Sequence, residues 1–273
     1  MDRILKTQIA QLMESVSETS LLPLWARAME SARKDALFRD EKAIEMLGAI
    51  DYDFSRFKKA WMSQLGIAVR TELFDKIVKD YLRQHPNGCV INLGAGFDSR
   101  FYRLDNDSVQ WHDIDLPDVI KLKRMLLKSN DRYHTIARSI LDYRWIDEIN
   151  KSEDPPLIIA EGLLMYFSEE QIKALMNKLV VAFPKATMAI ELLPMGAVGN
   201  SKWHEAIGWM NTTFKWSVDN IKQLERWNPA IRVNNEWCIL DYHWERWGAF
   251  SWFSWMPIYR FFLGERVVLL QFQ

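Results

Sequence analysis

Cysteine is scarce in this sequence: Cys89 and Cys238 are the two among 273 residues. Both lie in apolar stretches with the composition of strands, so we predict two buried free thiols and not a disulfide scaffold. The N-terminal stretch MDRILKTQIAQLMES lacks the continuous apolar core of a signal peptide, and no apolar run approaches the ~20 residues of a membrane span. These absences predict a reducing, cytoplasmic setting.

An excess of one sign of charge is also missing. The chain has 35 basic and 36 acidic residues, which gives a formal net charge of -1. This balance offers no electrostatic basis for binding nucleic acid or an anionic membrane, so neither is expected as a partner. The five histidines have no spacing with cysteine or with one another that predicts a metal site. Neither a Gly-x-Ser-x-Gly elbow nor a P-loop occurs.

Tryptophan, by contrast, is abundant. The chain contains 13 tryptophans, and nine of them fall between Trp203 and Trp255. Such a density of flat side chains is compatible with a pocket for an aromatic or hydrophobic ligand. The alternative is that these residues fill the core.

Strands and helices alternate through the middle of the chain, which is typical of a mainly parallel sheet with helices on both faces. We therefore predict an α/β fold, a doubly wound, Rossmann-like, seven-stranded sheet in which the last two strands form an antiparallel hairpin at the edge. The predicted strands are Cys89–Leu93, Val109–Ile114, Tyr133–Ala137, Leu157–Ala160, Ala186–Leu192, Ile231–Tyr242 and Glu265–Phe272.

The length fits one enlarged domain better than two. Within residues 1–273 we expect a helical cap over 1–65, a cofactor-binding core over 66–195, and an acceptor-region insertion with the final strands over 196–273. Predicted helices include Ile4–Val16, Leu21–Ala36, Glu41–Leu47, Gly66–Gln84, Asp118–Lys128 and a helix capped by Ser168 that runs to about Ala182.

Arg70 falls on the apolar face of the predicted helix Gly66–Gln84, in line with Phe74, Ile77 and Tyr81. An inward arginine needs an anion or other acceptors, because an unpaired buried charge is very costly. The ligand could supply that anion. The alternatives are a structural carboxylate or a side chain that reaches out to solvent.

A glycine turn follows the first strand of the alternation, in the segment INLGAGFDSR at 91–100. Gly94 and Gly96 allow a tight turn and let a ligand lie against bare backbone. A dinucleotide fingerprint would place Gly or Ala where this chain has Ser99, so the segment favours a ligand without a pyrophosphate, such as S-adenosylmethionine. Taken alone, a Gly-x-Gly turn is as often structural.

Acidic residues end the next strands. Asp113 and Asp115 point the same way on one strand, and Asp115 is nearer its carboxyl end, where ligands bind to such sheets. We therefore select Asp115 to accept hydrogen bonds from ribose hydroxyls; the alternative is a helix cap. Asp142 follows the third strand, where an adenine amino group could be read, or where it could cap a helix. Glu161 ends a buried strand, and a cationic ligand would justify its charge.

Together these segments resemble the leucine carboxyl methyltransferase family, and within it the bacterial branch typified by the tetracenomycin polyketide-synthesis O-methyltransferase. The resemblance covers about residues 20–185. It rests on LPLWARAME at 22–30, GIAVRTELFD at 66–75, NLGAGFDSRFYRL at 92–104, WHDIDLPDVIKLKRMLL at 111–127 and IAEGLLMYFSEEQI at 159–172.

The resemblance implies a class I fold that binds S-adenosylmethionine and methylates oxygen. It implies that Arg70 holds the methionine carboxylate, that Asp115 binds the ribose, that Leu141 and Asp142 contact adenine, and that Glu161 lies near the methionine end. The implied cofactor-binding set is Arg70, Gly94, Ala95, Gly96, Asp115, Leu116, Leu141, Asp142 and Glu161. Tyr166 falls where the family lines its acceptor pocket.

The acceptor is a small molecule in either of two chemistries. A carboxylate, the first expectation, is ionised at pH 7 and needs no base, which agrees with the absence of a convincing base motif. A phenol of a small aromatic metabolite is the alternative, and His204 and His243 are the histidines in the expected acceptor region. A dinucleotide oxidoreductase, disfavoured by Ser99, and a catalytically silent binding module remain as rival classes.

Overall fold

The computed structural model describes residues 9, 12–13, 16–150, 152–200 and 213–273. Most of the predicted helix Ile4–Val16 therefore lies outside the described residues. Within the described residues, seven strands form one sheet in the order β3-β2-β1-β4-β5-β7-β6. The strands are β1 (Cys89–Leu93), β2 (Gln110–Asp115), β3 (Tyr133–Ala137), β4 (Leu157–Ala160), β5 (Thr187–Leu192), β6 (Ile231–Cys238) and β7 (Arg266–Phe272).

The first five strands run parallel, so their carboxyl ends share one edge of the sheet. β7 runs antiparallel to both β5 and β6 and lies between them. This confirms the predicted doubly wound α/β fold with an antiparallel pair at one side. β6 is shorter than the predicted strand Ile231–Tyr242, because the chain turns at Ile239 into a short 3-10 helix, η8 (Ile239–Asp241).

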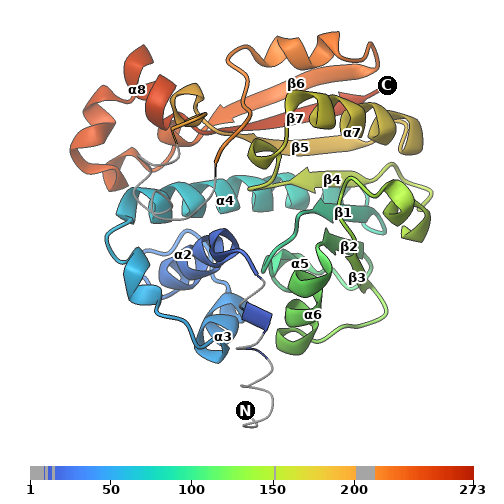
Figure 1. Cartoon of the computed structure of the whole chain (residues 1–273), viewed down its shortest axis with the longest axis horizontal. Helices are drawn as coiled ribbons and strands as arrows, with labels where there is room; N and C mark the ends of the chain where they lie inside the picture. Colours follow the sequence, from blue (N-terminus) through green and yellow to red (C-terminus); the bar gives the residue numbers. More distant parts are fainter. Residues whose placement is uncertain (1–8, 10–11, 14–15, 151, 201–212) are drawn as a thin grey trace.

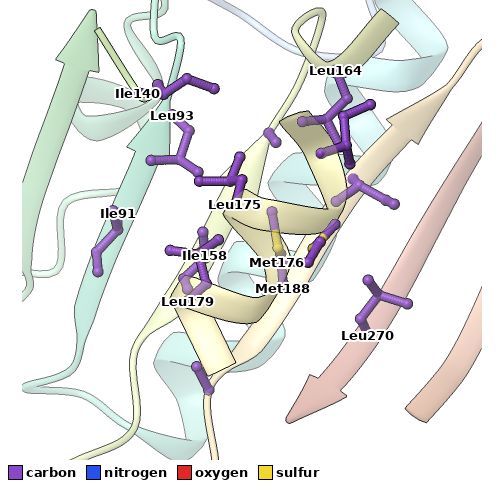
Figure 2. Packing of buried hydrophobic residues seen from close by; sticks show 14 of the residues in the cluster. Ile91, Leu93, Ile140, Ile158, Leu164, Leu175, Met176, Leu179, Met188 and Leu270 are labelled. Atoms are coloured by element: carbon purple, nitrogen blue, oxygen red, sulfur yellow. The ribbon is translucent and has the colours of Figure 1, made fainter. Parts of the chain in front are cut away.

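One face of the sheet is covered by α7 (Glu169–Ala182), whose apolar residues Leu175, Met176 and Leu179 pack on the strands. Alternate strand residues such as Ile91 point to this face, as a period of two requires. Figure 2 shows these side chains meeting between helix and sheet. As predicted, Ser168 caps α7, and it forms a capping box with Gln171.

The other face is covered by the long helix α4 (Trp61–Gln84), which contacts the intervening strand residues such as Val90 and Ile159. α4 begins five residues earlier than the predicted start at Gly66. Gly66 lies inside the helix, where the Ile239 side chain packs against it: a Cβ there would come within 3.3 Å of Ile239 Cδ1.

The N-terminal helices α2 (Leu21–Ser31) and α3 (Glu41–Ala49) form a separate apolar cluster with part of α6 (Pro117–Leu126). α2 ends at Ser31, five residues before the predicted end. In the segment that follows, the backbone N–H of Leu37 donates a hydrogen bond to the Glu30 side chain. In Figure 1, α2, α3 and α8 (Pro257–Leu263) all lie to the left of the sheet. α5 (Arg100–Leu104) completes the described α-helices.

Short 3-10 helices fill several connections. They are η1 (Glu18–Ser20), η2 (Phe54–Phe57), η3 (Tyr143–Glu148), η4 (Leu164–Tyr166), η5 (Met195–Ala197), η7 (Ile221–Arg226), η9 (Trp244–Arg246) and η10 (Gly248–Phe253).

Both cysteines are free and buried, as predicted, and burial raises the pKa of the Cys89 thiol to about 12. Within the described ranges, no helix combines the length and the apolar character that crossing a membrane requires.

Candidate functional site

The glycine turn after β1 leaves bare backbone at the carboxyl edge of the sheet. Gly94 has a φ of 62°, its N–H donates to Ile114 O at 2.8 Å, and a Cβ there would collide with the Leu163 side chain. Ala95 N–H donates to the same carbonyl at 3.2 Å. Gly96 has a φ of 46°, and a Cβ on it would meet nothing within 4 Å. The turn therefore needs glycine at both positions, and at Gly96 it faces open space that a ligand can occupy.

Asp115 supports this turn from the end of β2. Its Oδ2 accepts the N–H of Gly96 at 2.7 Å, and its Oδ1 accepts the N–H of Leu116 at 2.7 Å. Burial raises the pKa of this carboxyl above its ordinary value. The Leu116 side chain is 55% exposed beside it. A carboxylate and an apolar surface thus adjoin the open backbone at Gly96.

Asp113, two residues earlier, is closed off from any ligand. It is 1% exposed and accepts from Trp111 Nε1 at 2.8 Å, Asn92 Nδ2 at 3.2 Å, Lys123 Nζ at 2.5 Å and Tyr133 OH at 2.6 Å. Its role is structural, which leaves Asp115 as the candidate of the two.

Asp142 caps the 3-10 helix η3 and pairs with arginines. It accepts from Arg144 Nε at 2.7 Å and Nη2 at 2.6 Å, and from Arg138 Nη1 at 3.3 Å. The hydrogen bonds from Arg144 hold its pKa well below the usual range. Leu141 packs against the α7 side of the core. The helix-cap interpretation therefore describes Asp142 in this structure, and its carboxylate is already satisfied.

Arg70 points inward from α4 and meets three glutamates. Its Nε donates to Glu161 at 2.9 Å, and its Nη1 donates to Glu191 at 2.7 Å and to Glu265 at 3.4 Å. The third guanidinium nitrogen, Nη2, makes none of these bonds. It lies beside Gly162, at 3.9 Å from the position that a Cβ on that glycine would take. The inward arginine thus has structural carboxylates as partners and keeps one nitrogen directed to the loop after β4.

Glu161 connects Arg70 to a larger ion-pair network, because its Oε2 also accepts from Arg100 Nη2 at 2.7 Å. Among the residues that the structure describes, four arginines and six carboxyl groups are joined in this network, each side chain at most 14% exposed. Its members are Arg27, Arg70, Arg100, Arg103, Asp40, Asp75, Asp98, Glu161, Glu191 and Glu265.

Ser99 belongs to this arrangement as well. Its hydroxyl lies 2.7 Å from both carboxylate oxygens of Asp40, the N-cap residue of α3. Ser99, which stands where a dinucleotide fingerprint would have Gly or Ala, therefore connects α5 to the N-terminal helices. This contact is a structural reason for serine at that position, independent of the bound ligand.

A cavity of about 580 Å³ opens beside Arg70. Its polar end consists of Arg70, Glu191 and Glu265, and the rest of its wall is mainly apolar. Helix α2, helix α4, the segment after β5 and helix α8 all contribute, with lining residues that include Leu22, Pro23, Ile67, Gly162, Met165, Leu193, Phe214, Ile239, Phe250, Tyr259 and Phe262.

Tyr166 lines this cavity, where burial raises the pKa of its hydroxyl and its ring lies 5.8 Å from that of Phe214. His243 does not. Its Nε2 lies 2.6 Å from Glu72 Oε2, and the pair borders a different hollow, so the structure removes His243 as an acceptor-pocket candidate. His204 lies outside the described residues.

The tryptophans of the C-terminal region separate into several environments. Trp247 lines the cavity, and none of the other described tryptophans between 213 and 255 does. Trp216 belongs to the core against Trp227, and Trp252 and Trp255 are largely exposed. Of the two alternatives that the sequence left open, pocket or core, Trp247 alone among these described tryptophans fits the pocket; phenylalanine, tyrosine and aliphatic side chains form most of the apolar wall.

Glu191 and Glu265 escaped the sequence analysis. Glu191 carries the same signal as Glu161, an acid in a buried apolar strand, and could have been found by it. Glu265 precedes β7 and has no local signal, because its position depends on β7 pairing with β5. Across the described part of the chain, no group of three or more histidine, cysteine or acidic side chains is placed to hold a metal ion.

Comparison with known proteins gives a consistent result. The family model for leucine carboxyl methyltransferase matches residues 20–180. The tetracenomycin polyketide synthesis O-methyltransferase TcmP of Streptomyces glaucescens is 31% identical over 227 residues, covering 83% of this chain and 84% of that protein. The S-adenosyl-L-methionine-dependent methyltransferase dpfgK of Gibberella zeae is 26% identical over 87% of this chain and 86% of its own length.

Solved structures share the fold at low identity. A DUF574 family protein from Streptomyces avermitilis superposes with a TM-score of 0.61 at 10% identity, covering 96% of this chain and all of that one. Magnesium protoporphyrin IX methyltransferase from Synechocystis, with bound SAH, gives a TM-score of 0.50 at 10% identity, covering 86% of this chain and all of that one. The sheet is thus that of the class I methyltransferases.

Proposed function

The chain belongs to the leucine carboxyl methyltransferase family and is an S-adenosylmethionine-dependent methyltransferase, and from this premise we propose that it transfers the methyl group to an oxygen of a small hydrophobic acceptor. The name of the Streptomyces relative, an O-methyltransferase of polyketide synthesis, supports oxygen as the acceptor atom and a polyketide-like molecule as its bearer.

One observation carries the proposal. The open backbone at Gly96 and the mainly apolar cavity of about 580 Å³ are adjacent parts of the same sheet edge. They meet at Gly162 and Leu163: Gly162 lines the cavity, and Leu163 packs on Gly94 of the glycine turn. Ligands of open α/β sheets bind at this edge. A donor held at the turn and an acceptor held in the cavity would therefore be neighbours.

The residues at the turn fit S-adenosylmethionine. We assign the ribose hydroxyls to Asp115 and the methionine carboxylate to Nη2 of Arg70, the nitrogen outside its three glutamate contacts. We assign the ammonium group to Glu161. The full proposed set is Arg70, Gly94, Ala95, Gly96, Asp115, Leu116, Leu141, Asp142 and Glu161, in which Asp142 acts as the cap that holds the adenine-facing loop.

When bound, the cofactor supplies an activated methyl group on a positively charged sulfur. The protein holds donor and acceptor close and aligned, which can supply ~7–11 kcal/mol of the barrier. The cavity is walled by all three parts that we assign to the single domain: the cap over 1–65, the cofactor-binding core over 66–195 and the acceptor region over 196–273. Tyr166 belongs to the acceptor wall.

The acceptor oxygen is either a carboxylate or a hydroxyl. The sequence favoured a carboxylate because no base motif was visible. Glu191 and Glu265 change that argument, since the cavity contains two carboxyl groups that sequence reasoning missed. They support the alternative, a phenolic hydroxyl, as a second candidate.

The proposal is tested by ligand-dependent stability. S-adenosylmethionine and its demethylated product should each raise the melting temperature, because a ligand that binds the folded state alone stabilises it. At 100 times the dissociation constant the stabilisation is about 2.7 kcal/mol. NAD serves as the matched control. A shift with NAD and none with either S-adenosyl compound would contradict the methyltransferase proposal.

Replacing Asp115 with asparagine should weaken binding of S-adenosylhomocysteine by about 1.5–3 kcal/mol while the protein stays folded. The amide offers one oxygen where the carboxylate offers two, and its NH₂ group would face the backbone N–H of Gly96 or Leu116. Isothermal titration measures the affinity, with Asp118→Asn on the first turn of α6 as the control. Unchanged affinity in Asp115→Asn would remove Asp115 from the cofactor site.

A further inference from the structure

Glu265 is a carboxyl group in the cavity wall with one partner. Its side chain is 14% exposed, and among the described residues it bonds Arg70 alone, through Oε1 at 3.4 Å from Nη1. Its second oxygen, Oε2, makes no hydrogen bond with a described residue. A buried polar atom without a partner is costly. The cavity side of Glu265 is therefore a place where a ligand can complete the hydrogen bonds of this group.

The sheet register explains why Glu265 reaches the site. Leu192, the last residue of β5, pairs with Arg266, the first residue of β7, so Glu265 comes next to Glu191 at the carboxyl edge. The charged and titratable groups around it are Arg70 from α4, Glu191 from β5, Glu161 after β4 and the Cys238 thiol at the end of β6. Glu265 therefore stands between the cofactor-side arginine and the apolar cavity.

Glu265 is the member of the ion-pair network that is best placed to hold a proton. Among the described residues this network has two more carboxyl groups than guanidinium groups. Glu161 accepts from two arginines, and Glu191 accepts from Arg70 at 2.7 Å and from the N–H of Gly162 at 2.5 Å. A buried carboxyl group that lacks such bonds is neutralised by a proton. The long contact of Glu265 makes it that group.

The protonation behaviour of Glu265 agrees with its contacts. Burial, and then the neighbouring Glu191, raise the pKa of Glu265 to about 8, against the opposing effect of Arg70. Burial also raises the pKa of Glu191. Below pH 8, Glu265 therefore carries a proton that it can donate, as a carboxylic acid held neutral in an apolar site does.

We propose that Glu265, as a neutral carboxylic acid, donates a hydrogen bond to the carboxylate of the acceptor and thereby selects acids as acceptors, an inference that rests on the proposed O-methyl transfer. One acceptor oxygen accepts this bond. The other oxygen forms the bond to the methyl carbon as the sulfur–methyl bond breaks and its electron pair stays on sulfur. The proton remains on Glu265, so the step needs no base.

The same hydrogen bond distinguishes the substrate from the product. A hydrogen bond from a neutral acid to a carboxylate is charge-assisted and about twice as strong as one between neutral groups. After methyl transfer the acceptor is a neutral ester, so the bond becomes the weaker kind. Glu265 therefore favours binding of the acid and release of the ester. An ionised Glu265 would instead suit a phenol, so its protonation state decides between the two acceptor chemistries.

The first test measures binding to the protein loaded with S-adenosylhomocysteine, with 2-naphthoate and its methyl ester as matched two-ring probes. At about pH 6.5 wild type should bind 2-naphthoate more tightly than methyl 2-naphthoate. Its affinity for 2-naphthoate should fall about tenfold between about pH 6.5 and about pH 9, because Glu265 loses its proton while the probe stays ionised throughout. Binding of the uncharged ester should change little.

Two variants separate the donor from its titration. Glu265→Gln keeps a neutral donor that does not titrate, so its affinity for 2-naphthoate should be nearly independent of pH and should exceed that of wild type about tenfold at about pH 9. Glu265→Leu removes the donor, so it should bind 2-naphthoate at least about tenfold more weakly than wild type at about pH 6.5. Glu236→Gln is the control and should behave as wild type, because Glu236 lies on β6 and pairs with Arg266 at the surface.

Thermal unfolding shows whether the variants are folded and gives a second readout of the proton. Because folding raises the pKa of Glu265, its protonated form is favoured in the folded state, and the stability it contributes is lost as pH rises from 4.5 toward 8. The melting temperature of wild type should thus fall relative to that of Glu265→Gln over this range.

An affinity of wild type for 2-naphthoate that is constant or rises with pH would overturn the proposal, and so would unchanged binding in a folded Glu265→Leu. Binding of neither probe would also count against it, because the acceptor carboxylate would then not lie in the cavity beside Glu265. Failure of the proposed function would show differently, as the absence of binding by S-adenosylhomocysteine itself.

Discussion

Replacing Arg70 with alanine is expected to lower the free energy of unfolding by about 3–5 kcal/mol near pH 8. The change leaves Glu191 and Glu265 without the guanidinium that faces both, and Glu161 with Arg100 as its remaining partner. Removing one member of a buried ion pair leaves an uncompensated charge, and here it leaves two.

The loss should depend on pH in a definite direction. The pKa of Glu191 and that of Glu265 are already raised above their ordinary values by burial, and loss of Arg70 raises both further. Protonation then relieves the repulsion, so Arg70→Ala should be less destabilising at pH 5 and more so as pH rises toward 8. Urea denaturation across this range measures the effect.

Arg132→Ala is the matched control for this experiment, because Arg132 pairs with Asp105 in a more exposed position. Such a solvent-screened pair should contribute far less than the buried network around Arg70. If Arg70→Ala were no more destabilising than Arg132→Ala at pH 8, Glu191 and Glu265 would have to be neutral already. Cofactor binding is a separate readout. If Arg70 holds the methionine carboxylate, as proposed, the binding free energy of the folded variant should weaken by about 2–5 kcal/mol.

Replacing Lys123 with methionine should be about as destabilising, again by about 3–5 kcal/mol. Lys123 and Asp113 are an ion pair with side chains 0% and 1% exposed and a separation of 2.5 Å. Methionine fills much of the volume of lysine but leaves the Asp113 carboxylate with neutral donors alone. Chemical denaturation measures the loss, and Lys121→Met, on the exposed side of α6, is the control.

A double variant separates charge from packing. Asp113→Asn combined with Lys123→Met removes both charges, so it should recover part of the stability that Lys123→Met loses. A double variant as unstable as the sum of its single changes would show that the two residues act independently and that the ion pair is not the cause.

Most of the fold could be predicted from the sequence, because the strands of a parallel sheet are buried on both faces and read as short apolar runs. β1, β3 and β4 have the predicted bounds, as do the capping residues of α7. The predicted bounds of helices and strands were wrong where tertiary contacts override the local sequence pattern. Gly66 lies inside α4 and packs on Ile239, and β6 ends early at Cys238, where the chain turns into η8.

The parts of the site that are formed by residues close together in the sequence could be predicted, and the parts that depend on distant segments could not. The glycine turn and Asp115 follow directly from strand ends, and the geometry brings them together by a hydrogen bond. The cavity was not predictable, since its wall comes from many segments that lie far apart in the sequence, from Thr19 to Glu265. For the same reason the tryptophan count could not decide between pocket and core: composition does not show which side chains of a segment face a cavity. Glu265 reaches Arg70 across 195 positions of sequence, through the pairing of β7 with β5.

The place of β7 in the sheet also has a consequence for the order in which a ribosome delivers the chain. β7 comes last among the strands, yet it fits between β5 and β6, which are made earlier. Until residue 272 has emerged, β5 presents an unpaired edge with the apolar residues Ile190 and Leu192, the kind of edge that recruits strands from other chains. The same late segment delivers Glu265. Insertion of β7 should therefore cover the exposed edge of β5 and complete the cavity wall in the same step. Chaperone binding to ribosome-bound intermediates should end when β7 is inserted.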